Sequence, residues 1–310
     1  MMKLAGHTMG TPEYTLNEAV TLFSTLGFDG IEVIWDNEYG CALRKDASAD
    51  ALKAFQRHVS DHHLEVACLT PYMTEINALD TAQVQRDVAD FMRCIEVAGE
   101  LECPCIRVYG GSYMPDRDAA VRERKEQQLI ESLQLLGPQA AQVGVTLVVE
   151  THFNTLTCTA AETADLVRRV NHPHVRVLYD QPNLGFVGAE DYQEALPLLK
   201  GLIKMVHVKD FAFKDPTNRA FKASYVTNVK VSERIIRSKI PGEGIVPWPE
   251  ILPALHAQGF DGYLSLEYER RWHPEDLPLA DEGMKRGLEY IRNVLAEHIP
   301  PPSMEGTKGG

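Results

Sequence analysis

Basic residues are outnumbered in this chain, and no apolar run is long enough to cross a bilayer. The 310 residues include 31 Lys and Arg against 44 Asp and Glu, a formal net charge of −13 at pH 7. Surfaces that bind nucleic acid normally show clustered Lys and Arg. A membrane span needs about 20 consecutive apolar residues, and the amino-terminal segment also lacks the apolar core of a signal peptide. We therefore expect neither nucleic acid nor a membrane as a partner.

Cysteine pairs with the spacing of a zinc knuckle are missing too. The chain has six cysteines, and the closest pair is Cys103 and Cys105, within an apolar stretch. Scattered thiols fit a reducing compartment, so we expect a cytoplasmic protein in which this pair fills the core. A Gly-rich cradle for phosphate is also lacking, and together with the acidic balance this argues against a phosphorylated substrate.

The sequence does contain a regular alternation of strand-like and helix-like segments from end to end. Apolar runs rich in β-branched residues alternate with amphipathic segments of helical spacing, which is typical of βα units around a parallel sheet. Eight such units can be counted, and 44% of the residues are hydrophobic, enough for the core of one large domain. We predict a single (β/α)8 TIM barrel over residues 1–299 and a disordered, Pro- and Gly-rich tail over residues 300–310.

The pattern also predicts the individual elements. Strands are expected at residues 3–6, 30–35, 64–69, 104–109, 147–152, 175–180, 203–207 and 262–267, and helices at about 16–26, 51–62, 81–98, 118–142, 160–170, 190–200, from 248, and 281–297. Thr70 and Pro71 are expected to break the chain into a loop after the third strand. Residues 209–247 form a long polar insertion after the seventh strand, which we expect to arch over the barrel mouth or to reach a partner subunit of a homo-oligomer.

Four successive strands, the fifth to the eighth, end in a polar side chain. These side chains are Glu150, Asp180, His207 and Glu267. In a parallel barrel the carboxyl ends of all strands face one mouth, so the four should converge there. Three carboxylates so close together repel one another unless a cation neutralises them, and an oxygen-rich set with one imidazole favours Mn²⁺, Mg²⁺ or Co²⁺ over structural zinc. The alternative is that each acidic residue is a separate helix cap or surface group and that His207 is a core histidine. Four polar residues at the ends of four successive strands are hard to reconcile with this alternative.

Two short motifs accompany these residues. They are a His-x-Lys-Asp motif at residues 207–210 and a Gly-Glu-Gly motif at residues 242–244. With them, nearly the whole chain resembles the sugar phosphate isomerase/epimerase family of xylose isomerase-like TIM barrels. The resemblance implies that Glu150, Asp180, His207 and Glu267 bind one divalent metal ion, commonly Mn²⁺, whose coordination is completed by oxygens of a small carbohydrate substrate.

Several positions depart from relatives within this superfamily. Ketose 3-epimerases usually carry a His three residues after the ligand Asp and a substrate-binding Glu six residues after the first ligand, where this chain has Asn183 and Leu156. Endonuclease IV binds three zinc ions through extra histidines at strand ends three, four and six. This chain has Thr70, Tyr109 and Asn183 there, so a trinuclear DNA-repair site is not expected.

Other candidate residues lie at or just beyond the predicted strand ends. His152 is two positions beyond Glu150 and therefore on the same side of an extended chain, where it could transfer protons; a structural hydrogen bond is the alternative. Glu32 could bind a substrate hydroxyl or form a salt bridge with Arg107, and we favour the salt bridge. The residues expected to bind substrate are His7, Trp35, Tyr72, Tyr109, Asn183 and Lys209.

The predicted chemistry is removal of a proton from the carbon next to a carbonyl held on the metal, with Glu150, Glu267 or His152 as the base. Return of that proton makes the enzyme a sugar isomerase or epimerase, which is the preferred interpretation. Loss of a β-substituent makes it a lyase, as in the inosose dehydratases and C-glycoside-cleaving enzymes that resemble this family. A barrel that only binds carbohydrate is the third possibility, and it predicts no metal requirement.

Overall fold

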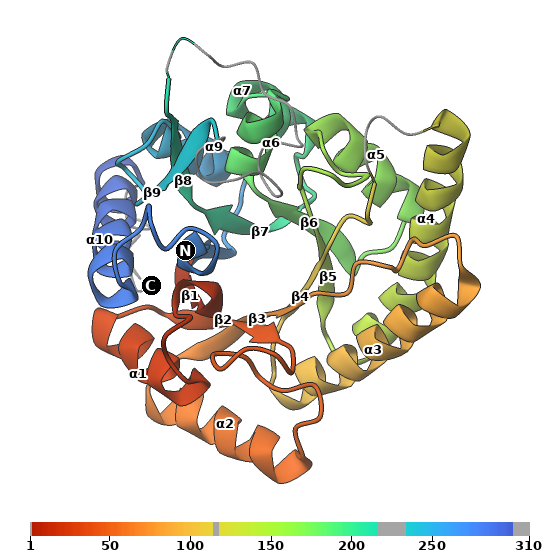
Figure 1. Cartoon of the computed structure of the whole chain (residues 1–310), viewed down its shortest axis with the longest axis horizontal. Coiled ribbons are helices and arrows are strands. Elements are labelled where there is room, and N and C mark those ends of the chain that lie inside the picture. Colours follow the sequence, from red (N-terminus) through yellow and green to blue (C-terminus); the bar gives the residue numbers. More distant parts are fainter. Residues whose placement is uncertain (1, 114–117, 216, 218–233, 300–310) are drawn as a thin grey trace, which may run out of the picture.

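Eight parallel strands close into a barrel, and helices cover its outer face (Figure 1). The computed structural model describes residues 2–113, 118–215, 217 and 234–299. The barrel strands are β1 (Lys3–His7), β2 (Gly30–Trp35), β3 (Glu65–Pro71), β4 (Cys105–Val108), β5 (Thr146–Glu150), β6 (Val175–Tyr179), β7 (Ile203–Val208) and β10 (Tyr263–Leu266). Their order around the barrel is β1-β10-β7-β6-β5-β4-β3-β2, which confirms the predicted (β/α)8 barrel.

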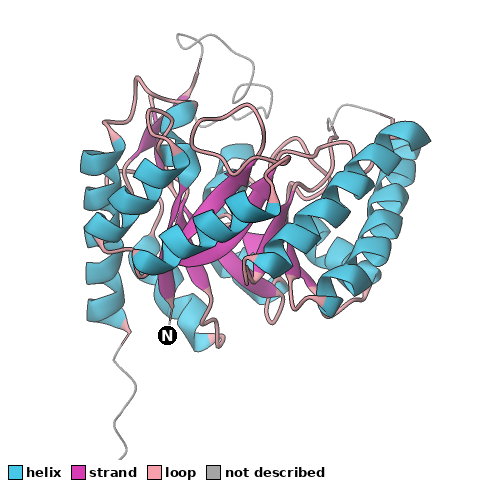
Figure 2. Ribbon diagram, turned by 90° about the horizontal axis from the view of Figure 1, so that it is seen from below, coloured by secondary structure: helices cyan, strands magenta, loops and turns pink. Residues whose placement is uncertain are grey.

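The helices lie outside the strands, and Figure 2 shows them beside and in front of the strands in a view turned by 90°. They are α1 (Leu16–Leu26), α2 (Ala49–Asp61), α3 (Thr81–Glu100), α4 (Ala119–Gln142), α5 (Ala160–Val170), α6 (Gln181–Val187), α7 (Tyr192–Leu198), α9 (Trp248–Ala257) and α10 (Ala280–His298), with 3-10 turns η1 (Thr8–Gly10) and η3 (Glu269–Arg271). The bounds of α1 and α5 are the predicted ones. Helix α6 was not predicted, because seven residues that include a Pro and a Gly show too little periodicity.

Local signals in the sequence account for the clean ends of α1. The Thr15 side chain accepts a hydrogen bond from the Glu18 N–H, and the Glu18 carboxylate accepts one from the Thr15 N–H, so the two residues form a capping box. Gly27 ends the helix in the left-handed region, with φ at 89°. The face of α1 with Ala19, Val20 and Phe23 is buried against the barrel.

Side chains inside the barrel are arranged in layers. An apolar layer fills the interior below the mouth and consists of Cys68, Cys105, Val148, Leu178 and Met205. Two residues further along the same segments are Thr70, Arg107, Glu150, Asp180 and His207. Alternate residues of a strand point to the same side and are about 6.6 Å apart, so these polar groups form the next layer towards the mouth. The apolar layer therefore lies directly below these polar groups.

The predicted break at Thr70 and Pro71 is wrong. Strand β3 continues to Pro71, with Thr70 paired to Ile34 and Pro71 paired to Trp35 of β2. Pro is tolerated there because it is the last residue of the strand. The longer strand keeps Thr70 on the inner side of the barrel, where its hydroxyl donates a short hydrogen bond to Glu32.

The described ends of the insertion after β7 pair with each other. Strands β8 (Asp210–Phe213) and β9 (Ile236–Lys239) form a two-stranded antiparallel sheet. The Asp210 carboxylate accepts hydrogen bonds from the N–H groups of Gly242 at 2.9 Å, and of Gly244 and Val246 at 3.0 Å each. A side chain at Gly244 would collide with that carboxylate. The His-x-Lys-Asp and Gly-Glu-Gly motifs are therefore joined in space, while residues 216 and 218–233 lie outside the described residues.

Three further expectations concern the chain as a whole. Residues 300–310, predicted to be a disordered tail, also lie outside the described residues. In the part of the chain that the structure describes, no helix is both long and apolar enough to span a membrane. None of the six cysteines forms a disulfide, and Cys103 and Cys105 are buried.

Candidate metal centre

Three carboxylates surround one nitrogen of the His207 imidazole at the carboxyl ends of β5, β6, β7 and β10. The His207 Nδ1 atom is 3.3 Å from Oε1 of Glu150, 3.6 Å from Oδ2 of Asp180 and 3.4 Å from Oε2 of Glu267. All four side chains are buried, and their potential ligand atoms lie within 4.8 Å of one another. Ligands about 2.0–2.2 Å from a cation, at tetrahedral to octahedral angles, are roughly 3–3.6 Å apart. The four predicted metal ligands therefore fit one divalent cation.

A buried ammonium group provides positive charge at the edge of this cluster. The Lys209 Nζ atom lies 2.9 Å from Oδ2 of Asp180, 2.6 Å from Oε2 of Glu267 and 3.3 Å from Oε1 of Glu269. Burial opposes the charge on Lys209, but the carboxylates of Asp180, Glu267 and Glu269 outweigh it and raise the pKa of the amine well above its ordinary value. Lys209 is thus a cationic hydrogen-bond donor that faces the same space as the candidate ligands.

The Glu150 carboxylate is held from two sides. Its Oε2 atom accepts a hydrogen bond from Nε of Arg107 at 2.7 Å and a shorter one from Nη2. The Asn183 amide, on α6, donates to Oε1 of Glu150 at 3.3 Å and to the Thr151 carbonyl at 3.1 Å. Burial by itself would raise the pKa of Glu150, but the Arg107 charge outweighs it and lowers the pKa well below the usual range. Glu150 is therefore a fixed anion.

The two carboxylate oxygens of Asp180 have different partners, one at the start of α6 and one in the cluster. Its Oδ1 atom accepts a hydrogen bond from the Asn183 N–H at 3.0 Å and so caps α6, which leaves Oδ2 directed at His207 and Lys209. Burial raises the pKa of Asp180 to about 6, although the Lys209 charge acts in the opposite direction. The cap fixes the orientation of the Asp180 carboxylate.

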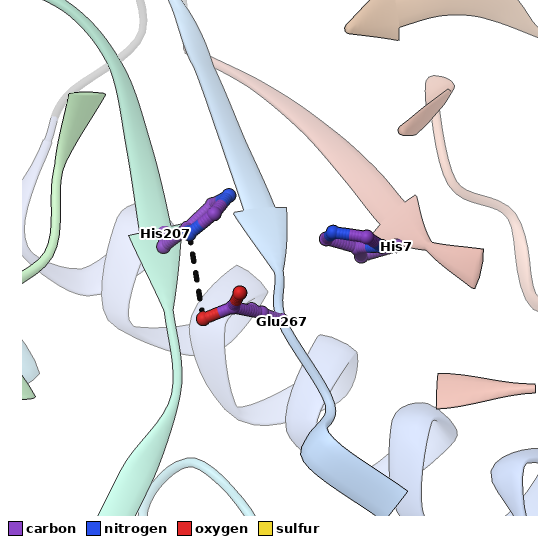
Figure 3. Close-up of side chains that lie close together, drawn as sticks. All are labelled: His7, His207 and Glu267. Carbon is purple, nitrogen blue, oxygen red and sulfur yellow. Dashed lines mark ion pairs between the residues drawn. The ribbon is translucent and has the colours of Figure 1, made fainter. Parts of the chain in front are cut away.

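The second nitrogen of His207 faces the opposite side of the barrel. Its Nε2 atom is 3.2 Å from both carboxylate oxygens of Glu32, on β2. Glu32 forms no ion pair with Arg107, so that prediction is wrong: Arg107 reaches Glu150 on the neighbouring strand β5 instead. Burial would raise the pKa of Glu32, but the charges of His7 and His207 lower it to about 2. Figure 3 shows His7 and Glu267 converging on His207 from β1 and from the end of β10.

His152 lies beside the cluster with a defined tautomer. Its Nδ1 atom is 2.7 Å from the Phe153 carbonyl oxygen, which can only accept, so Nδ1 carries the proton and Nε2 keeps a lone pair. The imidazole packs edge-on against the ring of Tyr109, with centroids 4.9 Å apart. Burial lowers the pKa of His152, although the Glu150 carboxylate opposes this effect. A neutral imidazole with a free lone pair can act as a general base.

The structure distributes the predicted substrate-binding residues between the site and the core. Tyr109 and Lys209 lie beside the cluster, and the Tyr72 hydroxyl is buried without a hydrogen-bond partner. His7 lies beside Glu32, with Nε2 and Oε1 3.5 Å apart, and Asn183 donates a hydrogen bond to Glu150. Trp35 belongs to the hydrophobic core, and Lys45 lies over its ring.

Two positioning contacts were missed by sequence reasoning, namely Arg107 on Glu150 and Glu32 on His207. The only sequence signal for either is a charged residue inside an otherwise apolar strand. Which partner each one takes depends on the order and stagger of strands around the barrel.

Metal binding should release protons and strengthen as the pH rises. In the metal-free protein, burial disfavours a charged His207, but Glu267 and Glu32 outweigh it and raise its pKa well above the ordinary value. A raised pKa means that the proton stays bound to a higher pH and competes with the cation, as the proton on Asp180 does below about pH 6. Calorimetric metal titrations in buffers of different ionisation enthalpy should show net proton release near neutral pH. A heat independent of the buffer would contradict this prediction.

Comparison with known proteins gives consistent findings. The model of the xylose isomerase-like TIM barrel family matches residues 20–294. An inosose dehydratase from Geobacillus thermodenitrificans is 26% identical over 297 residues, which cover 91% of this chain and 90% of that protein. The crystal structure of the IOLI protein with a zinc atom has a TM-score of 0.76 and 21% identity, over 97% of this chain and 100% of that one. A D-psicose 3-epimerase from Clostridium cellulolyticum H10 has a TM-score of 0.73 and 16% identity, over 95% of this chain and 99% of that one.

Proposed function

This chain belongs to the xylose isomerase-like TIM barrel family, and we propose that it is a metal-dependent enzyme that removes a proton next to a carbonyl group of a small polyhydroxylated substrate. The observation that carries the proposal is the convergence of Glu150, Asp180 and Glu267 on Nδ1 of His207, beside a neutral imidazole. The family membership confirms the resemblance seen in the motifs. Relatives that are sugar-modifying enzymes support a carbohydrate substrate.

The four converging residues would hold one divalent cation. Mn²⁺ is the proposed ion, because three carboxylate oxygens and one imidazole form a hard, mostly oxygen ligand set; the related IOLI structure, which holds zinc, makes Zn²⁺ the ion to compare. When bound, the cation would polarise the substrate carbonyl and make the adjacent C–H bond more acidic.

His152 is the proposed base. Its Nε2 lone pair is free, whereas Oε2 of Glu150 is engaged by Arg107 and Oε2 of Glu267 is engaged by Lys209. A carboxylate whose pKa is held well below the usual range is also a weak base. His152 would take the proton on Nε2 while Nδ1 stays bonded to the Phe153 carbonyl.

β-Elimination of water is the outcome that these contacts favour. His152 takes the α-proton, the electron pair of that C–H bond forms the new C=C bond, and the β-carbon–oxygen bond breaks. The departing hydroxyl takes a proton from a donor such as Lys209 and leaves as water. Epimerisation would need a second free base on the opposite face, and Glu150 is held by Arg107. Similarity to the inosose dehydratase supports the same outcome.

Epimerisation or isomerisation is the second candidate. Glu150 and Glu267 flank the proposed cation site as a pair of carboxylates, both close to His207. A substrate that displaced Lys209 from Glu267 would free that carboxylate to return a proton. The same cation and the same first proton transfer serve both reactions, so a single experiment separates them.

That experiment uses the Mn²⁺-loaded protein in deuterated water with inososes and ketohexoses as substrates. Loss of water is the expected result, with an absorbing α,β-unsaturated ketone whose α-carbon has lost its hydrogen signal in NMR. Deuterium uptake with an inverted or relocated hydroxyl and no loss of water would assign the protein to the epimerases or isomerases. Sugar binding that is unaffected by chelation, without any exchange, would indicate a carbohydrate-binding protein and refute the enzymatic proposal.

A further inference from the structure

Glu32 lies opposite the candidate ligands, on the far side of the His207 ring. It is fully buried, and both of its oxygens are 3.2 Å from Nε2 of His207. The other nitrogen of the same ring, Nδ1, faces Glu150, Asp180 and Glu267. The imidazole is therefore held between one carboxylate at its back and three at its front.

Two side chains besides His207 direct donor groups at Glu32. The Thr70 hydroxyl donates a short hydrogen bond to Oε1. The Nδ1 atom of His7 accepts a hydrogen bond from the Met9 N–H at 3.1 Å, so the proton of a neutral His7 is on Nε2, which lies 3.5 Å from Oε1 of Glu32. An ionised carboxylate can only accept hydrogen bonds, so Glu32 accepts one from Nε2–H of His207.

We propose that Glu32 is a positioning residue that keeps the proton of His207 on Nε2 and so presents the Nδ1 lone pair to the metal. This inference rests on the proposed metal site. A carboxylate that accepts from the outer nitrogen of a ligating histidine fixes its tautomer and its ring orientation and makes the other nitrogen a better ligand. Without Glu32, the His207 ring could turn or carry its proton on Nδ1. A proton on Nδ1 would occupy the lone pair that the cation needs.

The contact with His207 also explains why a carboxylate, that of Glu32, is buried beside the apolar layer. Glu32 is preceded on β2 by apolar residues and lies beside the apolar layer, in register with Cys68 of β3. A buried carboxylate destabilises the fold unless its charge is balanced by partners. No Lys or Arg in the described residues pairs with Glu32, and its ion-pair partners are His207 and His7. The closer of these two ion-pair partners, His207, is a candidate metal ligand.

The test compares Glu32→Gln and Glu32→Ala with Thr70→Val, a control that removes a donor to the same carboxylate but keeps its contact with His207. Affinities for Zn²⁺ and Mn²⁺ are measured by competition with a chelating dye, without any substrate. We expect Glu32→Ala to weaken metal binding by about 10–100-fold, the usual effect of losing such a partner. Glu32→Gln should lose less, because its amide oxygen still accepts from Nε2–H, and Thr70→Val should change the affinity least.

A spectroscopic measurement covers the possibility that Glu32→Ala does not fold. In zinc-loaded wild-type protein with ¹⁵N-labelled histidine, the proton of His207 should be found on Nε2. Its signal should shift in Glu32→Gln, while thermal unfolding of the metal-free variant shows whether the fold is kept.

Several results would overturn the inference. Folded Glu32 variants that bind metal as tightly as the wild type would show that Glu32 acts only in folding. A His207 proton on Nδ1 of the zinc-loaded protein would contradict the proposed tautomer. Two ions per chain, with the second one lost in a His7→Ala variant, would place Glu32 in a second metal site instead. If wild-type protein binds no divalent metal, the proposed function fails as well; if it binds metal without regard to Glu32, only this inference fails.

Discussion

Replacing Glu267 with Gln should abolish stoichiometric metal binding and reduce turnover to background. Glu267 lies 3.4 Å from Nδ1 of His207 and 2.6 Å from the Lys209 ammonium, so its charge would balance both the proposed metal ion and Lys209. The amide is neutral, and its oxygen is a weaker ligand than a carboxylate. The loss of affinity should therefore exceed the roughly 10–100-fold that removal of an outer partner costs. Elemental analysis of the purified variant and a metal titration measure it directly.

A matched control for this prediction is Glu65→Gln. Glu65 is an exposed carboxylate at the start of β3, where it pairs with Lys3 at 2.6 Å, far from the carboxyl ends of the strands. The control should keep both its metal and its activity. One metal ion per chain in Glu267→Gln, at undiminished affinity, would remove Glu267 from the ligand set and leave three protein ligands.

Replacing His152 with Gln should lower kcat by about 10²–10⁴-fold while the metal stays bound, because this is the usual contribution of a positioned acid or base. His152 is not among the four converging ligand atoms, and its Nδ1 proton is directed at the Phe153 carbonyl, 2.7 Å away. Gln can keep that hydrogen bond but has no basic nitrogen. Steady-state kinetics together with metal analysis of the same preparation check the prediction.

The control for His152→Gln is Tyr109→Phe. The Tyr109 ring packs against His152, and Phe keeps this contact while it removes the hydroxyl. A small effect in Tyr109→Phe and a large one in His152→Gln would separate proton transfer from packing. Loss of metal in His152→Gln would make His152 a ligand, and an unchanged kcat would assign it a structural hydrogen bond.

The local pattern of the sequence was sufficient to predict the barrel and to select the four candidate ligands. Periodicities of two and of about 3.6 residues locate strands and helices without knowledge of distant contacts, and Glu150, Asp180, His207 and Glu267 each follow an apolar strand. Parallel strands in a closed barrel share one mouth, so the convergence of these four followed from the fold class. Where local signals were weak the predictions were wrong, as at the short helix α6 and at Thr70 and Pro71.

The pairing of buried charges was decided only by the tertiary structure. Sequence placed Glu32 and Arg107 in neighbouring regions of the interior, but the stagger of the strands sends Arg107 to Glu150 and Glu32 to His207. Stagger and tilt are properties of the closed barrel as a whole, and a shift of one residue would turn either side chain to the other face of its strand. The sequence by itself therefore determined which residues reach the mouth, while closure of the barrel determined which of them contact one another.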